Sequence, residues 1–266
     1  MRFFAGPERW DSETMTLDAA ESHHAAAVLR VTPGQDVVVF DGEGRSAAAE
    51  VASVSKKETR LRLGEITRAE RLPRIVVATA VPKGQTMDWI IEKAVELGAS
   101  EIVPLLTERT IVRLSGEERA QRAAKWQRIA IEACKQCGQA WLPQVSSVAS
   151  LLEAITRFPA SEVRLPLVAS LQPDARPLDS FFERRKGAVS EKLPSAMMVV
   201  GPEGDFTERE YDLLRSRGFQ PVSFGQLVLR VETAVSFGLS VLRYELGRGS
   251  GDSRNEPPAD SGRNIL

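Results

Sequence analysis

The sequence is poor in the residues that build disulfide frameworks and metal sites. Its 266 residues include two cysteines, Cys134 and Cys137, and two histidines, His23 and His24. Two cysteines cannot supply the disulfide framework of a small secreted domain, so we expect a reducing compartment. The histidines are adjacent, do not share a face and lie far from the cysteines in the chain, so no zinc or other metal site is expected.

Strong net charge and long apolar runs are also missing. Lysine and arginine total 35 against 36 for aspartate and glutamate, a net charge of −1. Any nucleic-acid partner must therefore be met by local basic patches. No stretch approaches the roughly 20 apolar residues of a membrane helix, and residues 1–7 do not resemble a signal peptide. We expect a soluble, cytoplasmic protein with no membrane partner.

The spacing Cys134-x-x-Cys137 is the spacing of thioredoxin-like redox pairs. Such a pair lies at the start of a helix that follows a strand. Here the two cysteines fall at the end of a long predicted helix. We expect two thiols without redox chemistry.

Two turns that contain glycine follow predicted strands near the carboxyl end of the chain. The apolar run 197–200 predicts a buried strand and stops at Gly201-Pro202-Glu203-Gly204-Asp205-Phe206. A shorter predicted strand, 221–224, leads into the turn 225–230, and a helix is predicted over 231–246. Ligands of α/β proteins bind beyond the carboxyl ends of strands, so both turns are candidate parts of one site.

Arg230, Glu232 and Thr233 lie where the second turn becomes a helix. They bring a cation, a carboxylate and a hydroxyl to one place, which favours a catalytic or binding role. The alternative is a glycine turn with a solvated Arg–Glu pair. Because two such turns occur together with charged residues, we favour a site.

Residues 1–72 predict a small β-rich domain. Predicted strands at 15–17, 37–40, 47–54 and 60–66 are separated by turn signals and indicate a barrel or sandwich. The charged segment 68–74 is the predicted linker. A parallel βαβ unit follows, with strands at 75–81 and 101–106 around a helix at 86–97.

The rest of the second domain, 73–247, alternates predicted helices and strands. Capping boxes at Ser115/Glu118 and Thr207/Glu210 predict helix starts. A short helix is predicted over 147–155 and a strand over 163–168. The polar tail 248–266 is predicted to be disordered.

Basic residues cluster on two of the predicted elements. Arg60 and Arg62 share a strand face, and the long helix carries a spaced basic row, preceded in the chain by Arg109 and Arg113. Each cluster fits either a solvated surface or RNA phosphate contact. Arg109 and Arg113 favour RNA contact near the helix.

Several segments, in this order, resemble the small-subunit ribosomal RNA uridine N3-methyltransferases of the SPOUT superfamily. The resemblance covers nearly everything from residue 2 to residue 247. Its motifs are PKG at 82–84, MDWIIEKAVELG at 87–98, IVPL at 102–105, WQRIAIEA at 126–133, GPEGDF at 201–206 and LRVETA at 229–234. The amino-terminal pieces HH at 23–24, VLR at 28–30, PG at 33–34 and FDG at 40–42 also match.

The resemblance implies a SPOUT-type α/β fold, whose parallel sheet ends in a carboxyl-terminal trefoil knot, behind a small PUA-like β-barrel that binds RNA. It implies a homodimer that takes S-adenosylmethionine as methyl donor and the 16S RNA of the small ribosomal subunit as substrate. The implied cofactor-binding residues are Val168, Ala169, Ser170, Leu171, Val200, Gly201, Pro202, Glu203, Gly204, Phe206, Phe224, Gly225, Gln226, Leu227, Val228 and Leu229. The implied RNA-binding residues are Arg2, His24, Arg30, Lys83, Arg109, Arg113 and Arg128.

The chemistry of uridine methylation assigns expected roles at the second turn. A sulfonium donor is already activated. Uridine N3 carries a proton, so an enzyme must remove that proton before N3 can accept the methyl group. Arg230 is the expected cation beside the developing anion, Glu232 the expected base or base-orienting group, and Thr233 a support. The alternatives are the same fold acting on another RNA nucleotide, and an RNA-binding assembly factor without catalysis.

Four positions depart from the family pattern. Gln139 stands where relatives often have arginine, Gln226-Leu227 replaces a common Pro-Arg, and Phe224 stands where leucine is usual. Loss of arginine at 139 and 227 would weaken RNA contact, whereas the donor pocket would be kept.

Overall fold

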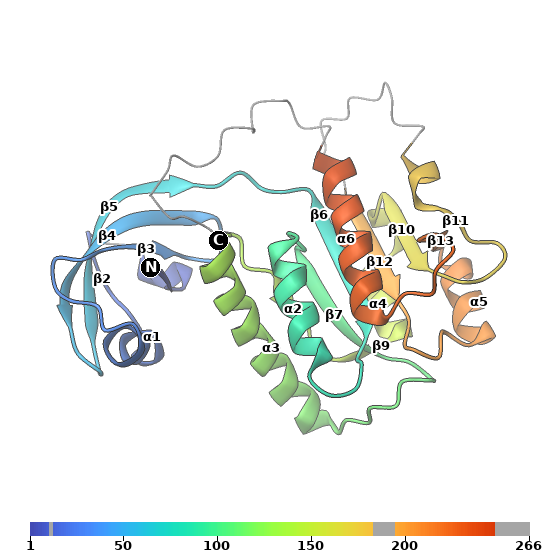
Figure 1. The fold of residues 1–266 in the computed structure, drawn as a ribbon, viewed down its shortest axis with the longest axis horizontal. Coiled ribbons are helices and arrows are strands. Elements are labelled where there is room, and N and C mark those ends of the chain that lie inside the picture. The colour runs from blue at the N-terminus through green and yellow to red at the C-terminus, as the bar shows by residue number, and fades with distance from the viewer. Residues whose placement is uncertain (11–12, 183–194, 248–266) are drawn as a thin grey trace.

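The protein is described by a computed structural model over residues 1–10, 13–182 and 195–247. Two separate sheets organise these residues (Figure 1). The predicted disordered tail, 248–266, lies outside the described residues.

The first sheet is formed by the amino-terminal part of the chain. Its strands, in spatial order, are β1 (Arg2–Phe4), β3 (Asp36–Phe40), β4 (Arg45–Val54), β5 (Thr59–Arg68) and β2 (Thr14–Thr16). The β1–β3 pair is parallel and the other pairs are antiparallel. The sheet curves beside α1 (Ala19–His23), which continues as one π-helical turn, His24–Val28 (Figure 1). Every second side chain in the central parts of β3 and β4 is apolar and buried, and these side chains form part of the core of this domain.

The second sheet is parallel throughout. Its order is β11 (Arg176–Pro177), β13 (Gln220–Ser223), β10 (Leu165–Ala169), β12 (Ser195–Val200), β6 (Arg74–Ala80), β7 (Glu101–Leu106) and β8 (Gln144–Val145), with β9 (Ala149–Ser150) beside β7. The β-branched run of β6 suits a strand buried on both faces. The predicted parallel α/β sheet behind a small amino-terminal β domain is confirmed, whereas the trefoil knot stays a prediction.

Helices cover both faces of this sheet. One face packs against α2 (Thr86–Glu96), α3 (Gly116–Cys137) and α6 (Val231–Gly247), and the other against α4 (Leu151–Arg157) and α5 (Glu208–Ser216). Odd-numbered and even-numbered residues of β6 enter opposite cores, as strand geometry requires. The sheet is therefore a central layer with all its carboxyl ends at one edge.

The predicted helix starts at Ser115 and Thr207 are confirmed as full capping boxes. The prediction for 147–155 was wrong at its start, because a third capping box, Ser150 with Glu153, begins α4 at Leu151. Cys134 is buried and Cys137 exposed at the end of α3, and both are free thiols.

Helix α3 joins the two parts of the molecule. The Lys135 ammonium on α3 contacts the Glu21 carboxylate of α1, and both side chains are nearly buried. Arg2 of β1 lies over the Phe40 ring and donates to the backbone carbonyl of Gln139, at 3.5 Å. These contacts hold the first sheet against the end of α3.

Candidate functional site

A cavity of about 250 Å³ opens at the carboxyl edge of the parallel sheet. It lies among the loops that follow β10, β12 and β13, which are neighbours or near neighbours in the sheet. This is the position at which parallel sheets bind ligands. The two glycine turns singled out in the sequence thus meet at one site, together with the exit of β10.

Most of the predicted cofactor residues line this cavity. They are Ala169, Ser170, Leu171, Val200, Gly201, Pro202, Glu203, Phe224, Gly225, Leu227, Val228 and Leu229. The lining does not include four others, which belong to the same strands and loops: Val168, Gly204, Phe206 and Gln226. Arg230 lines the cavity as well.

The loop 201–206 is held in an unusual backbone conformation. Asp205 has φ 62°, in the left-handed region where aspartate is one of few tolerated residues. Its Oδ1 accepts hydrogen bonds from the Phe206 amide at 2.8 Å and from the Tyr211 hydroxyl at 2.7 Å. A Cβ on Gly201 would lie 3.0 Å from the Phe206 ring, so close packing of that ring favours glycine. The carboxylate is therefore fixed at the cavity wall.

Burial raises the pKa of the Tyr211 phenol above its ordinary value, and the hydrogen bond to Asp205 raises it further. The hydroxyl therefore stays protonated and donates throughout the neutral range. Tyr211 lies on α5, so the bond ties the loop to a helix.

The loop 224–230 supplies an apolar wall. Gly225 has φ 109°, which only glycine adopts readily, and its amide donates to Ser223 Oγ at 3.2 Å. Leu227 and Val228 are each 77% exposed. Exposed apolar side chains beside a cavity mark a surface that a ligand can cover.

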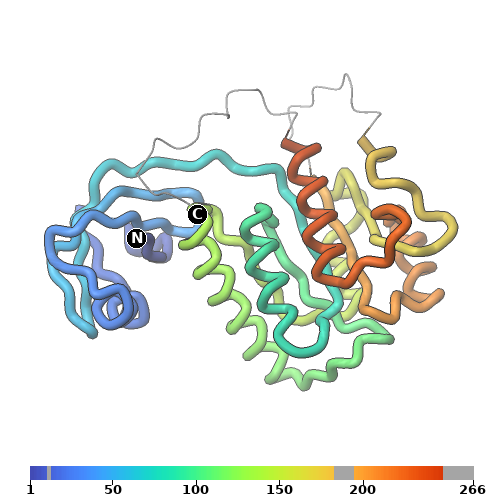
Figure 2. The backbone as a smooth tube through the Cα atoms, in the orientation of Figure 1, coloured from blue at the N-terminus to red at the C-terminus, as the bar shows by residue number. Residues whose placement is uncertain are grey.

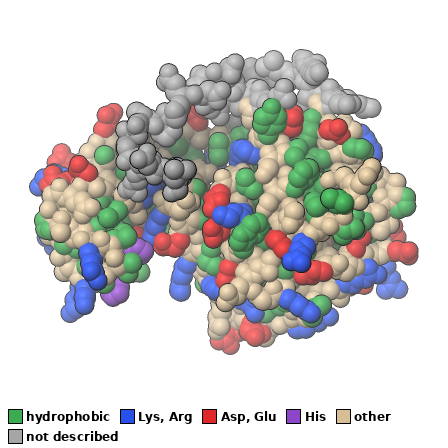
Figure 3. All heavy atoms as spheres, in the orientation of Figure 1, with side chains coloured by type: hydrophobic (Ala, Val, Ile, Leu, Met, Phe, Trp, Pro, Cys, Tyr) green, Lys and Arg blue, Asp and Glu red, His purple; other side chains and the backbone are tan. Residues whose placement is uncertain are grey.

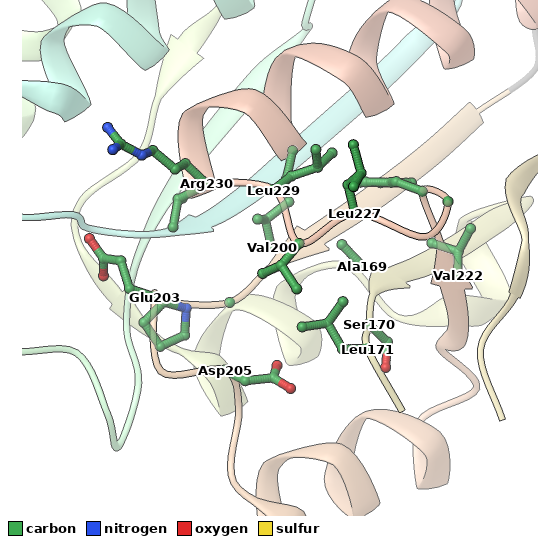
Figure 4. A pocket seen from close by; sticks show the side chains of 17 residues that line it. Ala169, Ser170, Leu171, Val200, Glu203, Asp205, Val222, Leu227, Leu229 and Arg230 are labelled. Atoms are coloured by element: carbon green, nitrogen blue, oxygen red, sulfur yellow. The ribbon is translucent and has the colours of Figure 1, made fainter. Parts of the chain in front are cut away.

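Polar and apolar side chains both line the cavity (Figure 4). Arg230 and Glu203 lie on one side, and Leu227 and Val222 lie on the other.

The three predicted catalytic residues lie at the start of α6. The Arg230 carbonyl accepts the first helical hydrogen bond, from the Ala234 amide at 2.8 Å, and its side chain is exposed. Glu232 is half-buried in the first turn, and Thr233 is exposed. Within the described residues no ion pair joins Arg230 to Glu232, so the solvated pair considered from the sequence is not formed.

Three of the predicted RNA-binding residues lie on loops at the same edge as the cavity. Lys83 is exposed on the turn after β6. Arg113 is exposed after β7 and donates to the Thr110 carbonyl at 2.6 Å. Arg109 donates to the Gly204 carbonyl at 2.7 Å, so its side chain supports the loop 201–206. Their RNA contacts stay predictions.

The other predicted RNA-binding residues lie elsewhere. Arg2 is half-buried against Phe40, and His24 is half-buried in the π-helical turn. Arg30 is exposed with φ 52°, and Arg128 is exposed on α3. Arg2 therefore makes contacts within the protein, whereas Arg30 and Arg128 have exposed side chains.

The two basic clusters considered from the sequence differ from each other. Arg60 pairs with Glu58, and Arg62 pairs with Glu50 at 3.1 Å, which favours the solvated strand edge. On α3, Lys125 pairs with Asp88 at 2.5 Å, while Arg128 forms no ion pair within the described residues.

Four cavity residues were absent from the prediction: Asp205, Val222, Val231 and Ala234. Asp205 follows directly from the GPEGDF motif, and its acidic side chain in a glycine turn was a usable signal. In the described part of the chain, no group of three His, Cys, Asp or Glu side chains could hold a metal ion. No helix described there is long and apolar enough to cross a membrane.

Family models match both parts of the chain. An RNA methyltransferase domain matches residues 69–243, and an RNA methyltransferase PUA domain matches residues 17–67. Two curated relatives, each named ribosomal RNA small subunit methyltransferase E, match most of the chain. The protein of Synechocystis is 32% identical over 90% of this chain and 76% of its own, and that of Bacillus subtilis is 31% identical over 90% and 94%.

Solved structures give the same result. A ribosomal RNA small subunit methyltransferase E of Neisseria gonorrhoeae, bound to S-adenosylmethionine, superposes with a TM-score of 0.79 at 31% identity, over 91% of this chain and 96% of that one. A Legionella pneumophila protein in complex with the same cofactor gives 0.80 at 29% identity, over the same shares.

Proposed function

This chain belongs to the ribosomal RNA small subunit methyltransferase E family, and from this premise we propose that it methylates N3 of one uridine in small-subunit ribosomal RNA. The methyl donor is S-adenosylmethionine. The observation that carries the proposal is the cavity at the carboxyl edge, built from the three loops expected to bind that donor.

The residues of the cavity suit the donor chemically. S-adenosylmethionine supplies a methyl group on a sulfonium cation, which needs no further activation. Leu227, Val228 and Leu229 offer apolar cover to an adenine ring, and the Glu203 and Asp205 carboxylates lie where positive charge would be favoured. Backbone amides and carbonyls of the same loops can form hydrogen bonds with the edge of the adenine ring.

The acceptor sets the harder requirement, because uridine N3 carries a proton. Arg230 lines the cavity and offers a cation to the oxygen that gains charge when the proton leaves. Glu232 lies two residues on, half-buried in the first turn of α6, and is the proposed base or base-orienting group. Thr233 supports the turn. The uridine must leave its stack to reach this cavity.

The two parts of the chain divide the work. We propose that residues 1–72 hold RNA as a PUA-like module and that residues 73–247 carry the transfer. Lys83 and Arg113 extend from loops at the same edge as the cavity, where they can contact phosphates beside the reacting uridine.

We propose that the working form is a homodimer joined through the helix face of α2 and α6. On this face Trp89 is 43% exposed, Phe237 42% and Tyr244 65%. Hydrophobic side chains gather over these helices (Figure 3). An apolar face of this kind favours association. Sedimentation of the purified protein tests it, and a monomer at micromolar concentration would contradict it.

The function is tested by incubating the protein with unmethylated small ribosomal subunits and labelled S-adenosylmethionine. The RNA is then digested and the labelled nucleoside is identified by mass spectrometry. We expect label in 3-methyluridine from the small-subunit RNA.

Other outcomes separate the alternatives. Label in a different nucleoside would refute the uridine N3 assignment. No label, with donor binding intact, would point to another RNA as substrate. Absence of both label and donor binding would favour an assembly factor without catalysis.

A further inference from the structure

A second hollow, of about 1130 Å³, lies between the two sheets. Its wall includes the turn at 41–43, the segment that links β5 to β6, and the amino ends of β6, β7 and β8. It therefore lies at the sheet edge opposite the donor cavity. The seven residues of β6 separate the two edges by about 20 Å.

Three arginines of the linking segment line this hollow: Arg68, Arg71 and Arg74. All three are exposed. The guanidinium of Arg68 lies 5.6 Å and that of Arg71 4.8 Å from the Trp141 ring centre, and that of Arg74 lies 5.5 Å from the Phe158 ring. Within the described residues none of them forms an ion pair with a carboxylate. Figure 2 shows the segment crossing from one sheet to the other.

Trp141 is a rigid platform for two of these cations. Its Nε1 donates to the carbonyls of Ala69 and Glu70, each at 3.2 Å. Backbone hydrogen bonds on both sides of it, Gly44 N to Ala140 O at 3.1 Å and Leu142 N to Gly42 O at 2.9 Å, attach it to the first sheet. A ring fixed in this way holds the stacked guanidiniums before any partner arrives, so little side-chain entropy is lost on binding.

Four carboxylates line the hollow beside the three arginines, and two of them are paired with other arginines. Asp41 is paired with Arg45 at 2.6 Å, and Glu101 is paired with Arg157 at 2.7 Å. The other two, Glu43 and Glu162, form no ion pair with the three arginines within the described residues, so the arginines outnumber the unpaired carboxylates of the hollow by one. Stacked guanidiniums keep their N–H edges free, and those edges match phosphate oxygens in pairs.

We propose that Arg68, Arg71 and Arg74 form a second RNA-binding surface, which contacts backbone phosphates of the substrate RNA at a distance from the methylated nucleotide. The proposal rests on the proposed function, since it takes the substrate to be an RNA. The contact is independent of base sequence, because phosphates carry the recognition. It would hold a remote part of the RNA while the uridine occupies the donor cavity.

The test measures binding of the full chain to a fluorescent transcript of small-subunit RNA at several salt concentrations. The variant replaces all three arginines by glutamine: Arg68→Gln, Arg71→Gln and Arg74→Gln. Three lost contacts to single-stranded phosphates should reduce the slope of log K against log salt by about two, at about 0.7 for each contact. The affinity for S-adenosylmethionine should not change.

A second triple variant controls for net charge outside the proposed RNA-holding module: Lys93→Gln, Lys125→Gln and Arg215→Gln. These side chains already pair with Glu96, Asp88 and Asp174. Both triple variants lose three positive charges. In the control, each lost cation had been paired with a neighbouring carboxylate. We expect the slope of this variant to stay within a few tenths of the wild type.

Three results would overturn the inference. The first is a salt slope for the Arg68/Arg71/Arg74 variant that equals the wild-type slope. If the wild type still methylates the subunit, the proposed function stands and only the second surface is refuted. The second is an equal loss in both variants, which would reflect overall charge. The third is a loss of binding to intact subunits with none to the naked transcript, which would assign the hollow to a protein partner. The proposed function fails separately, if the wild type leaves no label in 3-methyluridine of the small-subunit RNA.

Discussion

The Tyr211 hydroxyl on α5 donates a 2.7 Å hydrogen bond to Oδ1 of Asp205 in the donor-cavity loop. Asp205 has a positive φ, and the same oxygen accepts from the Phe206 amide. A residue in the left-handed region costs free energy that its surroundings must offset. The bond from Tyr211 is one of several hydrogen bonds that hold this loop, with those from the Phe206 amide, from the Asp205 amide to the Pro202 carbonyl and from Arg109 to the Gly204 carbonyl.

Tyr211→Phe removes the donor and keeps the buried ring. A hydrogen bond to a charged acceptor contributes about 1.5–3 kcal/mol, so we expect the affinity for S-adenosylmethionine to fall about tenfold or more, measured by calorimetry. The control is Ser216→Ala, which removes an exposed hydroxyl from the same helix. Equal donor affinity in the two variants would show that the bond does not organise the loop.

Gly238 sets the distance between α6 and the sheet. A Cβ at this position would lie 2.2 Å from Met198 Sδ and 3.0 Å from the Phe224 ring. Gly238→Ala should therefore lower the free energy of unfolding by about 1–3 kcal/mol, as overpacking does. Gly247→Ala, in the same helix, meets nothing within 4 Å and should not destabilise. Chemical denaturation compares the two, and equal midpoints would contradict this account.

Local sequence signals predicted the elements well. Ser115 and Thr207 marked helix starts, because a capping box satisfies backbone groups within four residues. The missed box at Ser150 misplaced the start of α4. The contact between Lys135 and Glu21 could not be predicted, since it joins residues far apart in sequence and depends on how the two sheets meet.

The loops that form the site could be predicted from sequence motifs, whereas the side-chain contacts that hold those loops could not. The strand and turn pattern identified both glycine turns as one candidate site, and the family resemblance added the methyl donor and the third loop, 168–171. The support that Arg109 gives to Gly204 links positions from different loops, and no sequence pattern connects them. Asp205 has a role only because Tyr211 lies beside it after α5 folds.

The two cysteines should differ in reactivity from redox thiols. Burial raises the pKa of Cys134 to about 12, and burial also raises the pKa of the Cys137 thiol. Only the thiolate reacts, so at pH 8 roughly one Cys134 in ten thousand is reactive. We expect Cys134 to resist alkylation in the native state and to react once the protein is unfolded.

Mass mapping after alkylation at pH 7 and pH 9 measures both thiols. Modification at Cys137 should be slower than that of a free cysteine and should increase at the higher pH, because a raised pKa moves thiolate formation upward. Rapid native modification of Cys134 at pH 7, or a disulfide between the pair, would contradict the prediction.

Glu232→Gln tests the proposed base. The amide keeps the shape of the side chain but cannot take a proton, and general-base catalysis typically contributes 10²–10⁴-fold. We expect kcat to fall by about that factor at pH 7, with donor affinity unchanged, because Glu232 does not line the cavity. The matched control is Glu208→Gln, an exposed carboxylate in the first turn of α5. Raising the pH should partly restore turnover in Glu232→Gln, since hydroxide then competes for the N3 proton. Full turnover with native subunits at pH 7 would mean that another group, or water held elsewhere, removes that proton, and Arg230 alone would then remain as the proposed catalytic residue.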